Sequence, residues 1–328
     1  MPPLPKVITT SVIRSARQGE SHGGVYIVDL HSGEIQQVID WNDSNIDWEG
    51  RGGDRGLRGI AFHKGKIYLA ASDEIFVYSR DFRLLQSYTN RYLRRCHEID
   101  IVDDTLYLTS TELNSVLLFD LLSDRFISGH VIARGPPGKR SLFDRVRGAA
   151  NSEAKFTVTA FDPNSDGGPT IGADSSSLHI NNVSRSGDAI MISGTRIEAL
   201  LALRDGTLRE YAPLPRGTHN AAVFKDGLIY NDTGSDRLVV TDTNNRIRRS
   251  FAVPRFDAGE LSHTDIPDDH ARQSFARGLC IYNDRMVIGG SSPSTISVYD
   301  LETGETIKQV NISKDIRNCI HGLELWPG

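Results

Sequence analysis

The chain has little of what marks secreted and membrane-spanning proteins. It contains three cysteines in 328 residues, too few for a disulfide framework. No apolar run approaches the ~18 residues of a membrane span, and the first residues lack the apolar core of a secretion signal. We therefore expect a reduced, cytoplasmic protein without a membrane span.

The chain also lacks an excess of positive charge and several familiar catalytic motifs. The formal net charge is -5 at pH 7, and no stripe of Lys and Arg runs along the chain. This balance argues against a nucleic-acid partner. The sequence has no Cys-x-x-Cys pair, no phosphate-binding glycine loop and no Gly-x-Ser-x-Gly elbow. We expect a small-molecule partner and no nucleic acid.

What the sequence does have is a short strand repeated six times. In each repeat, apolar residues fall mostly two and four places after a polar lead residue, which is the period of a strand. The repeats occupy 58–62, 97–101, 179–183, 219–223, 277–281 and 321–325. The lead residue is His in four repeats and Arg in two. Since the chain has only 10 His, this concentration indicates a shared role.

The repeats predict a propeller. After each of the first five repeats come a turn and a second strand, and third and fourth strands joined by a hairpin are recognisable in several of them. Units of ~40–45 residues with four strands are typical of β-propellers. The last repeat lacks three strands, which 6–10, 25–29 and 35–40 can supply. We predict an all-β, six-bladed β-propeller, one domain over 1–328, closed by N-terminal strands pairing with the C-terminal strand. A β-sandwich would not explain the incomplete last repeat.

Two intervals between repeats are much longer than the others. They carry insertions at about 132–177, with a hairpin around 156–161, and at about 254–274. Each insertion leads from a fourth strand to the next lead residue, so both begin on the rim that holds the lead residues. Long insertions in compact domains are usually lids or binding loops. We expect them to form a lid over the channel mouth.

The inner strands of a propeller surround its central channel, so the six lead residues converge there. We call them the axial ring: Arg58, His97, His179, His219, Arg277 and His321. Converging imidazoles suit a transition metal better than Ca²⁺ or Mg²⁺, which prefer oxygen ligands. We predict that the four histidines bind one metal ion, first of all Fe(II), with Cu, Zn or Ni as alternatives. The other interpretation is a hydrogen-bonded ring that binds an anion without metal.

Charged residues near the axial ring complete the candidate site. Arg58 and Arg277 would position a small anionic substrate through bidentate donors. Metal-bound His usually donates its second N–H to a carboxylate or carbonyl. Carboxylates that could serve are Glu98, Asp100 and Glu324 on the lead strands, and Glu112 and Asp232 on loops of the same rim. We take Arg58, Arg277, Glu98, Glu112 and Asp232 as the candidate catalytic residues.

These strand starts resemble known propellers in three ways. The pattern resembles six-bladed gluconolactonase-like and strictosidine-synthase-like proteins, although His stands where their calcium-binding members have Glu, Asn and Asp. The four-His axial site is similar to that of the carotenoid cleavage oxygenases, which implies a non-haem ferrous ion. Cys96-His97, Leu178-His179-Ile-Asn181 and Arg277-Gly-Leu279 are similar to an uncharacterised bacterial propeller family.

Three functions remain in view, because the propeller scaffold hosts many activities. The first is a non-haem iron or copper oxygenase or oxidase that acts on a small anionic substrate. The second is a zinc- or nickel-dependent hydrolase, lyase or isomerase. The third is a propeller that binds an anionic ligand or a peptide without catalysis.

Overall fold

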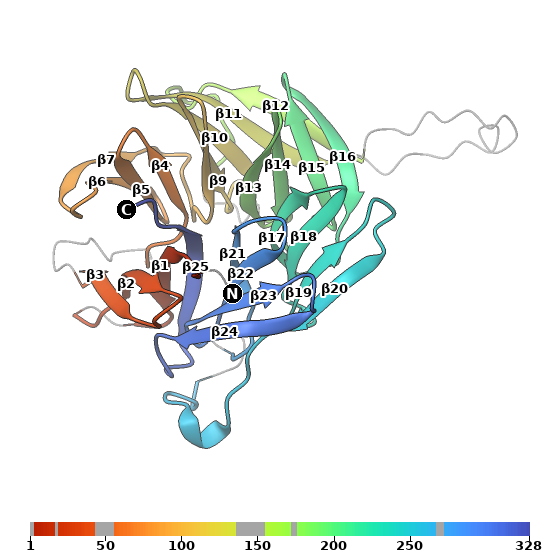
Figure 1. The fold of residues 1–328 in the computed structure, drawn as a ribbon. Helices are drawn as coiled ribbons and strands as arrows, with labels where there is room; N and C mark the ends of the chain where they lie inside the picture. The colour runs from red at the N-terminus through yellow and green to blue at the C-terminus, as the bar shows by residue number, and fades with distance from the viewer. Residues whose placement is uncertain (1–2, 17–18, 43–55, 136–154, 172–175, 267–271) are drawn as a thin grey trace, which may run out of the picture.

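The computed structural model describes residues 3–16, 19–42, 56–135, 155–171, 176–266 and 272–328. Its strands form six antiparallel sheets arranged in a ring, which confirms the predicted six-bladed β-propeller (Figure 1). We number the blades 1 to 6 in the chain order of their inner strands.

Blades 1 to 3 are formed by consecutive strands. Blade 1 contains β4 (Ile60–His63), β5 (Lys66–Ala71), β6 (Glu74–Ser79) and β7 (Leu84–Thr89). Blade 2 contains β8 (Ile99–Val102), β9 (Thr105–Ser110), β10 (Ser115–Asp120), β11 (Arg125–Arg134) and β12 (Phe156–Phe161). Blade 3 contains β13 (Ile180–Ser186), β14 (Ala189–Gly194), β15 (Ala199–Arg204) and β16 (Thr207–Pro213).

Blades 4 and 5 follow the same plan, whereas blade 6 combines both ends of the chain. Blade 4 contains β17 (Thr218–Phe224), β18 (Gly227–Asp232), β19 (Arg237–Thr241) and β20 (Ile247–Ala252). Blade 5 contains β21 (Arg277–Ile281), β22 (Met286–Ser291), β23 (Thr295–Asp300) and β24 (Glu305–Asn311). Blade 6 contains β25 (Asn318–Leu325), β1 (Lys6–Ile13), β2 (Gly23–Asp29) and β3 (Ile35–Asp40).

The closure of the propeller is the predicted one. The C-terminal strand β25 pairs antiparallel with β1, in a register that sets Val7 opposite Leu325 and Val12 opposite Cys319. The strand from one end of the chain is thereby completed by three strands from the other. This pairing covers the backbone edge that β25 would otherwise expose.

The hydrophobic core is divided among the six junctions between neighbouring blades. Six apolar clusters each combine residues of two adjacent blades. Between blades 2 and 3, for example, Val116 packs with Ile180 and Ile192, all fully or almost fully buried. Because side chains alternate along a strand, each sheet presents apolar residues to both of its neighbours. The junctions therefore hold the inner strands in fixed positions around the axis.

The described parts of the two insertions pack against the body of the propeller. In the first, β12 pairs with β11 as a fifth strand of blade 2. In the second, the short 3-10 helix η1 (Ala258–Glu260) precedes a bridge between Ser262 and Asp315. Their function as a lid stays a prediction, and residues 136–154, 172–175 and 267–271 lie outside the described residues. The described segments contain no helix long and apolar enough to cross a membrane.

Candidate functional site

The axial ring lies at or near the starts of the inner strands, which contact one another in the order β4, β8, β13, β17, β21, β25 and back to β4. Arg58, His97, His219 and His321 are buried, whereas His179 and Arg277 are partly exposed. The imidazole centroids of His97 and His179 are 5.6 Å apart, and those of His97 and His321 are 6.0 Å apart. Residues distant in sequence therefore meet at the axis, as predicted.

Glycines next to three lead residues allow the blades to approach closely. A Cβ built on Gly59 would lie 2.7 Å from the backbone oxygen of His97 in the next blade. A Cβ on Gly322 would lie 2.3 Å from the backbone oxygen of Arg58. Gly278 has a φ of 75°, a conformation that favours glycine. Larger side chains at these positions would push the lead residues of adjacent blades apart.

His97 is anchored through its Nδ1 atom. This atom lies 2.9 Å from Thr111 Oγ1 and 2.9 Å from the backbone oxygen of Arg95. Thr111 donates its hydroxyl proton to the backbone oxygen of Ile180 in blade 3, so toward His97 it acts as an acceptor. A carbonyl oxygen can only accept. The Nδ1 atom of His97 therefore carries the imidazole proton, and Nε2 carries the lone pair.

His219 repeats this arrangement in blade 4. Its Nδ1 atom lies 2.9 Å from Thr233 Oγ1, and Thr233 donates to the backbone oxygen of Ala276 at 2.8 Å. The threonine follows the histidine by 14 residues in both blades. The Nε2 atom of His219 is buried and has no hydrogen-bond partner among the described residues. His219 thus presents an unused lone pair.

The third buried histidine of the axial ring, His321, is bound through its opposite nitrogen. Arg277 donates from its guanidinium NH1 to His321 Nε2 at 2.7 Å, so this lone pair is already used. On the other side of His321, Arg58 NH1 lies 3.4 Å from each ring nitrogen of His97 and donates to the backbone oxygen of Cys96 at 3.3 Å. Two guanidinium groups are therefore interleaved with the imidazoles.

All four imidazoles are held neutral. Burial, reinforced by nearby Arg cations, lowers the pKa of His97, His219 and His321 well below the usual value. Burial, followed by Arg277, lowers the pKa of His179 to about 4. Neutral imidazoles keep a lone pair on one nitrogen, which is required of a metal ligand or a general base.

The predicted four-His metal centre is not assembled in the described part of the chain. There, no three His, Cys, Asp or Glu side chains are placed to hold one metal ion. The strand bulge falls one residue after His219 and Arg277 but two residues after His179, so His179 lies one position outside the shared register. A φ of 49° at His179 accompanies this offset. Metal binding by His97, His179, His219 and His321 stays a prediction.

Three of the predicted carboxylates lie close together beside the axial ring. Burial raises the pKa of Glu98 to about 7, although Arg277 and Arg58 act in the opposite direction. Burial, with repulsion from Asp100 and Glu98, raises the pKa of Glu324 to about 8. The pKa of Asp100 is also raised by burial. Glu98 and Asp100 belong to blade 2 and Glu324 to blade 6, so the charge of a carboxylate in one blade shifts the pKa of a carboxylate in another.

The two predicted loop carboxylates have local partners. Glu112 forms an ion pair with Arg95, with Nε and Oε2 3.3 Å apart. Asp232 accepts a hydrogen bond from the Ser235 hydroxyl at 2.6 Å within the turn after β18. Both lie at the expected rim, and a catalytic role for either stays a prediction.

Sequence reasoning missed Phe275, which directly follows the second insertion. The guanidinium carbons of Arg277, Arg272 and Arg14 lie 4.6, 4.9 and 5.1 Å from the centroid of its ring. The imidazole of His219 meets the same ring edge-on, at 5.1 Å between centroids. Phe275 thereby joins His219 to the guanidinium of Arg277. The sequence signal was weak, since a lone Phe beside an insertion has no repeat to mark it.

Cys96, which precedes His97, does not supply a thiolate ligand. All three cysteines are buried and free. Burial raises the pKa of the Cys96 thiol to about 12, so it remains protonated at neutral pH.

Comparisons with known proteins identify the fold and no family. No protein-family model matches the chain, and no curated protein matches it. A protein of unknown function from Bacteroides caccae is similar in structure, with 11% identity over 99% of this chain and 100% of that chain, and a TM-score of 0.58. A chain of a nidogen/laminin complex aligns over 97% of both chains, with 10% identity and a TM-score of 0.58. Apo AztD from Citrobacter koseri aligns over 98% and 97% of the two chains, with 10% identity and a TM-score of 0.50.

Proposed function

We propose that the axial ring binds a small carboxylate substrate and catalyses proton transfer next to its carboxylate, as an isomerase or lyase does. The observation that carries this proposal is the unused Nε2 lone pair of His219. Thr233 fixes the tautomer of this imidazole, and the ring of Phe275 contacts both the imidazole and the guanidinium of Arg277. A neutral imidazole with a fixed tautomer is suited to act as a general base.

The arginines provide the complementary charge. Arg58 and Arg277 offer planar donors that match a carboxylate. In the proposed step, His219 Nε2 accepts a proton from the carbon next to the carboxylate. The electron pair of that C–H bond moves onto the carboxylate oxygens, where a guanidinium stabilises the added negative charge. The substrate either takes the proton back at another position or loses a leaving group.

The experiment begins with binding. Small mono-, di- and tricarboxylates are screened by thermal shift, and those that raise the melting temperature are incubated with the protein in D₂O. We expect NMR to detect deuterium at the carbon next to the carboxylate, and expect His219→Asn to abolish this incorporation while the same carboxylate still binds. If no carboxylate binds, or if the variant exchanges at the wild-type rate, the proposal is wrong.

A metal-dependent reaction is the second candidate, because His97 and His219 share an arrangement that suits metal ligation. In each, Nδ1 is anchored and Nε2 carries the lone pair, as in many metal-binding histidines. Two imidazoles on one ion have centroids roughly 5–6 Å apart, given metal–nitrogen bonds of ~2.1 Å. The His97–His179 separation of 5.6 Å fits that range. Bound Fe(II) or Cu would support an oxygenase or oxidase, and Zn or Ni would support a hydrolase, lyase or isomerase.

Metal analysis separates the two candidates. Protein purified without a histidine tag and without chelators is measured for metal content beside His97→Ala and His179→Ala. One ion per chain, lost in both variants, would favour the metal-dependent reaction, and oxygen consumption would then distinguish Fe or Cu chemistry. Wild-type protein free of stoichiometric metal that still exchanges substrate protons would favour the metal-free reaction.

A further inference from the structure

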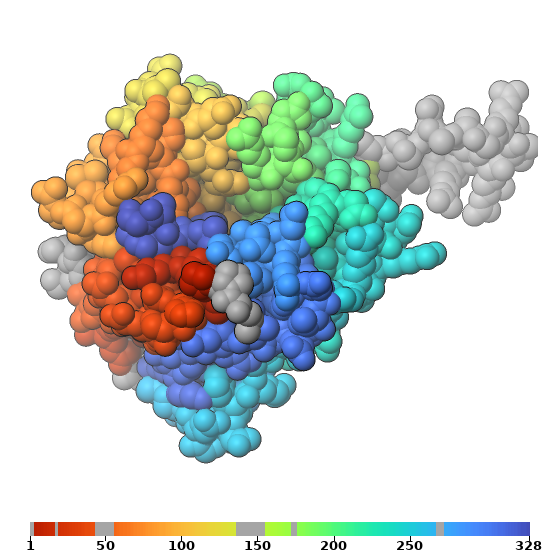
Figure 2. Space-filling model, in the orientation of Figure 1, coloured from red at the N-terminus to blue at the C-terminus, as the bar shows by residue number. Residues whose placement is uncertain are grey.

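A second site, separate from the axial ring, lies where the C-terminal segment meets blade 1. A pocket of ≈ 330 Å³ is lined by residues of the β4–β5 turn, by Arg80 after β6, and by Trp326 and Pro327 after β25. Figure 2 shows the C-terminal residues (dark blue) between the N-terminal strands (red) and blade 1 (orange). We call this the Trp326 pocket. Its volume is within the range of small-molecule sites.

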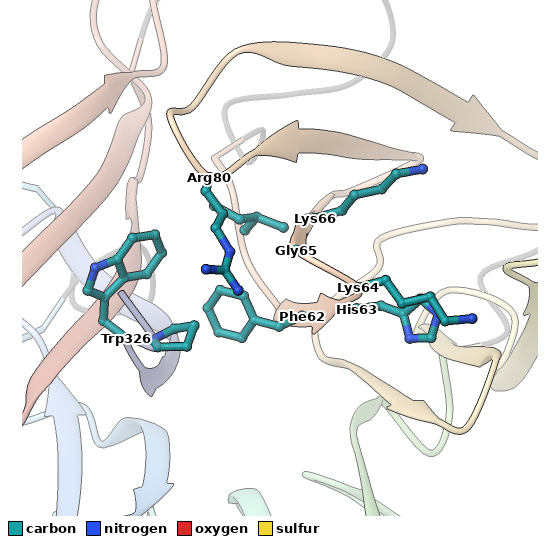
Figure 3. A pocket seen from close by; sticks show the side chains of 9 residues that line it. Phe62, His63, Lys64, Gly65, Lys66, Arg80 and Trp326 are labelled. Carbon is teal, nitrogen blue, oxygen red and sulfur yellow. The ribbon is translucent and has the colours of Figure 1, made fainter.

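The rings of Phe62 and Trp326 line one part of the Trp326 pocket, and Phe82 supports Trp326 from outside the lining. Trp326 stacks on Phe82, with centroids 5.6 Å apart and planes at 21°. Phe62 lies 6.1 Å from Trp326 at 60°. Figure 3 shows the guanidinium of Arg80 pointing toward Phe62. Trp326 lies on the side of Arg80 that is away from Gly65 and Lys66. A flat apolar group could contact these rings while an attached anion meets Arg80.

The charge of this pocket differs from that of the grooves of blades 3 and 4. Its lining contains His63, Lys64, Lys66 and Arg80, and no Asp or Glu. Asp104 binds His63 and Lys64, at 2.9 and 2.6 Å. Lys66 and Arg80 form no ion pair within the described segments. Two cations are therefore left to meet an incoming anion.

In each of the grooves of blades 3 and 4, one arginine forms an ion pair with an aspartate of the turn after the inner strand. In blade 4, Arg248 forms a two-pronged ion pair with Asp226, at 3.0 and 2.8 Å. In blade 3, Arg204 pairs with Asp188 at 2.5 Å. Blade 1 has Gly65 in its turn where the other two blades have these aspartates. The Trp326 pocket thus combines the rings of Phe62 and Trp326 with Arg80, which forms no ion pair with any described residue.

We propose that the Trp326 pocket binds a small planar aromatic carboxylate, with its ring against Trp326 and Phe62 and its carboxylate on Arg80. This proposal does not depend on the function of the axial ring. A carboxylate held by a planar guanidinium gains charge-assisted hydrogen bonds, and the aromatic faces provide the contact area.

Isothermal titration calorimetry with 1-naphthoate tests the proposal. Acetate supplies the anion without the ring, and 1-naphthylmethanol supplies the ring without the charge. We expect wild-type protein to bind 1-naphthoate and to bind the other two much more weakly. Arg80→Gln should weaken 1-naphthoate binding about tenfold or more, because a charged hydrogen bond contributes ~1.5–3 kcal/mol.

Further variants provide the controls. Arg248→Gln changes an arginine of the blade 4 groove, on the fourth strand β20, and should leave 1-naphthoate binding unchanged. Trp326→Leu should weaken 1-naphthoate binding as Arg80→Gln does. Because Arg80 is exposed, we expect Arg80→Gln to leave folding unchanged. The proposal is overturned if wild type does not bind 1-naphthoate, if 1-naphthylmethanol binds equally well, or if Arg248→Gln weakens binding as much as Arg80→Gln.

Discussion

His219 in blade 4 and His321 in blade 6 occupy the same place in the repeat but are bound through opposite nitrogens. His219 donates from Nδ1 to Thr233 and leaves Nε2 without a hydrogen-bond partner among the described residues. His321 instead accepts at Nε2 from Arg277. The difference shows that a shared register fixes where a side chain lies and leaves its chemistry to its neighbours. His219 is equipped to accept a proton, whereas His321 holds a guanidinium in place.

The largest expected effect comes from removing the open imidazole. His219→Asn should lower the rate of substrate proton exchange by about 10²–10⁴-fold, the usual contribution of a general base. His321→Gln keeps a side-chain group that can accept from Arg277, and should lower the rate much less. NMR measurement of deuterium incorporation checks both variants. Equal losses in the two would remove the distinction between the histidines.

The anchoring threonine should have the next largest effect. Thr233→Val removes the acceptor that fixes the His219 tautomer, and should lower the exchange rate about 10- to 100-fold, as loss of an orienting partner does elsewhere. Thr233→Ser retains the hydroxyl and should restore most of the rate. The pH profile of the exchange rate should change in Thr233→Val, whereas partial unfolding would lower the rate without changing that profile. A serine variant as slow as the valine variant would contradict the orienting role.

Arg277 links the two kinds of histidine. Arg277→Gln should weaken carboxylate binding at the axis about tenfold, measured by calorimetry, since a charged hydrogen bond is lost. It should also raise the pKa of His321, because Arg277 is, after burial, the strongest influence that lowers it. NMR titration of the His321 ring measures this shift. An unchanged titration would show that Arg277 does not govern His321.

The smallest expected effect concerns the carboxylate group beside the axial ring. The pKa of Glu324 is raised to about 8 by burial and by Asp100 and Glu98. The folded state therefore holds a proton that the unfolded state releases near pH 4.3. The free energy of unfolding falls as the pH rises from about 4.3 to about 8. Glu324→Gln should thus be more stable than wild type at pH 9 and similar at pH 4.

Glu324 is surrounded by protein, which raises its pKa, but its side chain is still in contact with water that screens the charge, so the expected gain is only about 1 kcal/mol. In a protein of this size that corresponds to roughly 2–4 °C in melting temperature. Thermal unfolding at both pH values measures it. A gain at pH 4 equal to that at pH 9 would mean that repulsion among the carboxylates is not the cause.

Much of the fold could be predicted because propeller strands repeat. The alternation of apolar residues located the inner strands, and the incomplete last repeat required the pairing of β25 with β1. The meeting of Arg58, His97 and His321 at the axis followed from that topology. The lid stays a prediction, and the described strand of the first insertion, β12, extends blade 2 as a fifth strand.

The site chemistry could be predicted less well, because it depends on contacts between blades. A one-residue difference in the position of the bulge moved His179 out of the common register. The approach of Arg277 to His321 depends on the packing of the neighbouring blades 5 and 6, which no local sequence pattern encodes. Thr111 and Thr233 could have been found, since both follow a lead His by 14 residues. Phe275 had no such signal.

The most direct test of this account is long-range ¹H–¹⁵N NMR of the histidine side chains at pH 7. The account predicts that His97 and His219 are neutral and protonated on Nδ1, with Nε2 carrying the lone pair. Thr111→Val and Thr233→Val assign each signal. Protonation of Nε2, or a charged imidazolium at either residue, would contradict the account, because Thr111 and Thr233 would then not fix the tautomer that leaves the lone pair on Nε2.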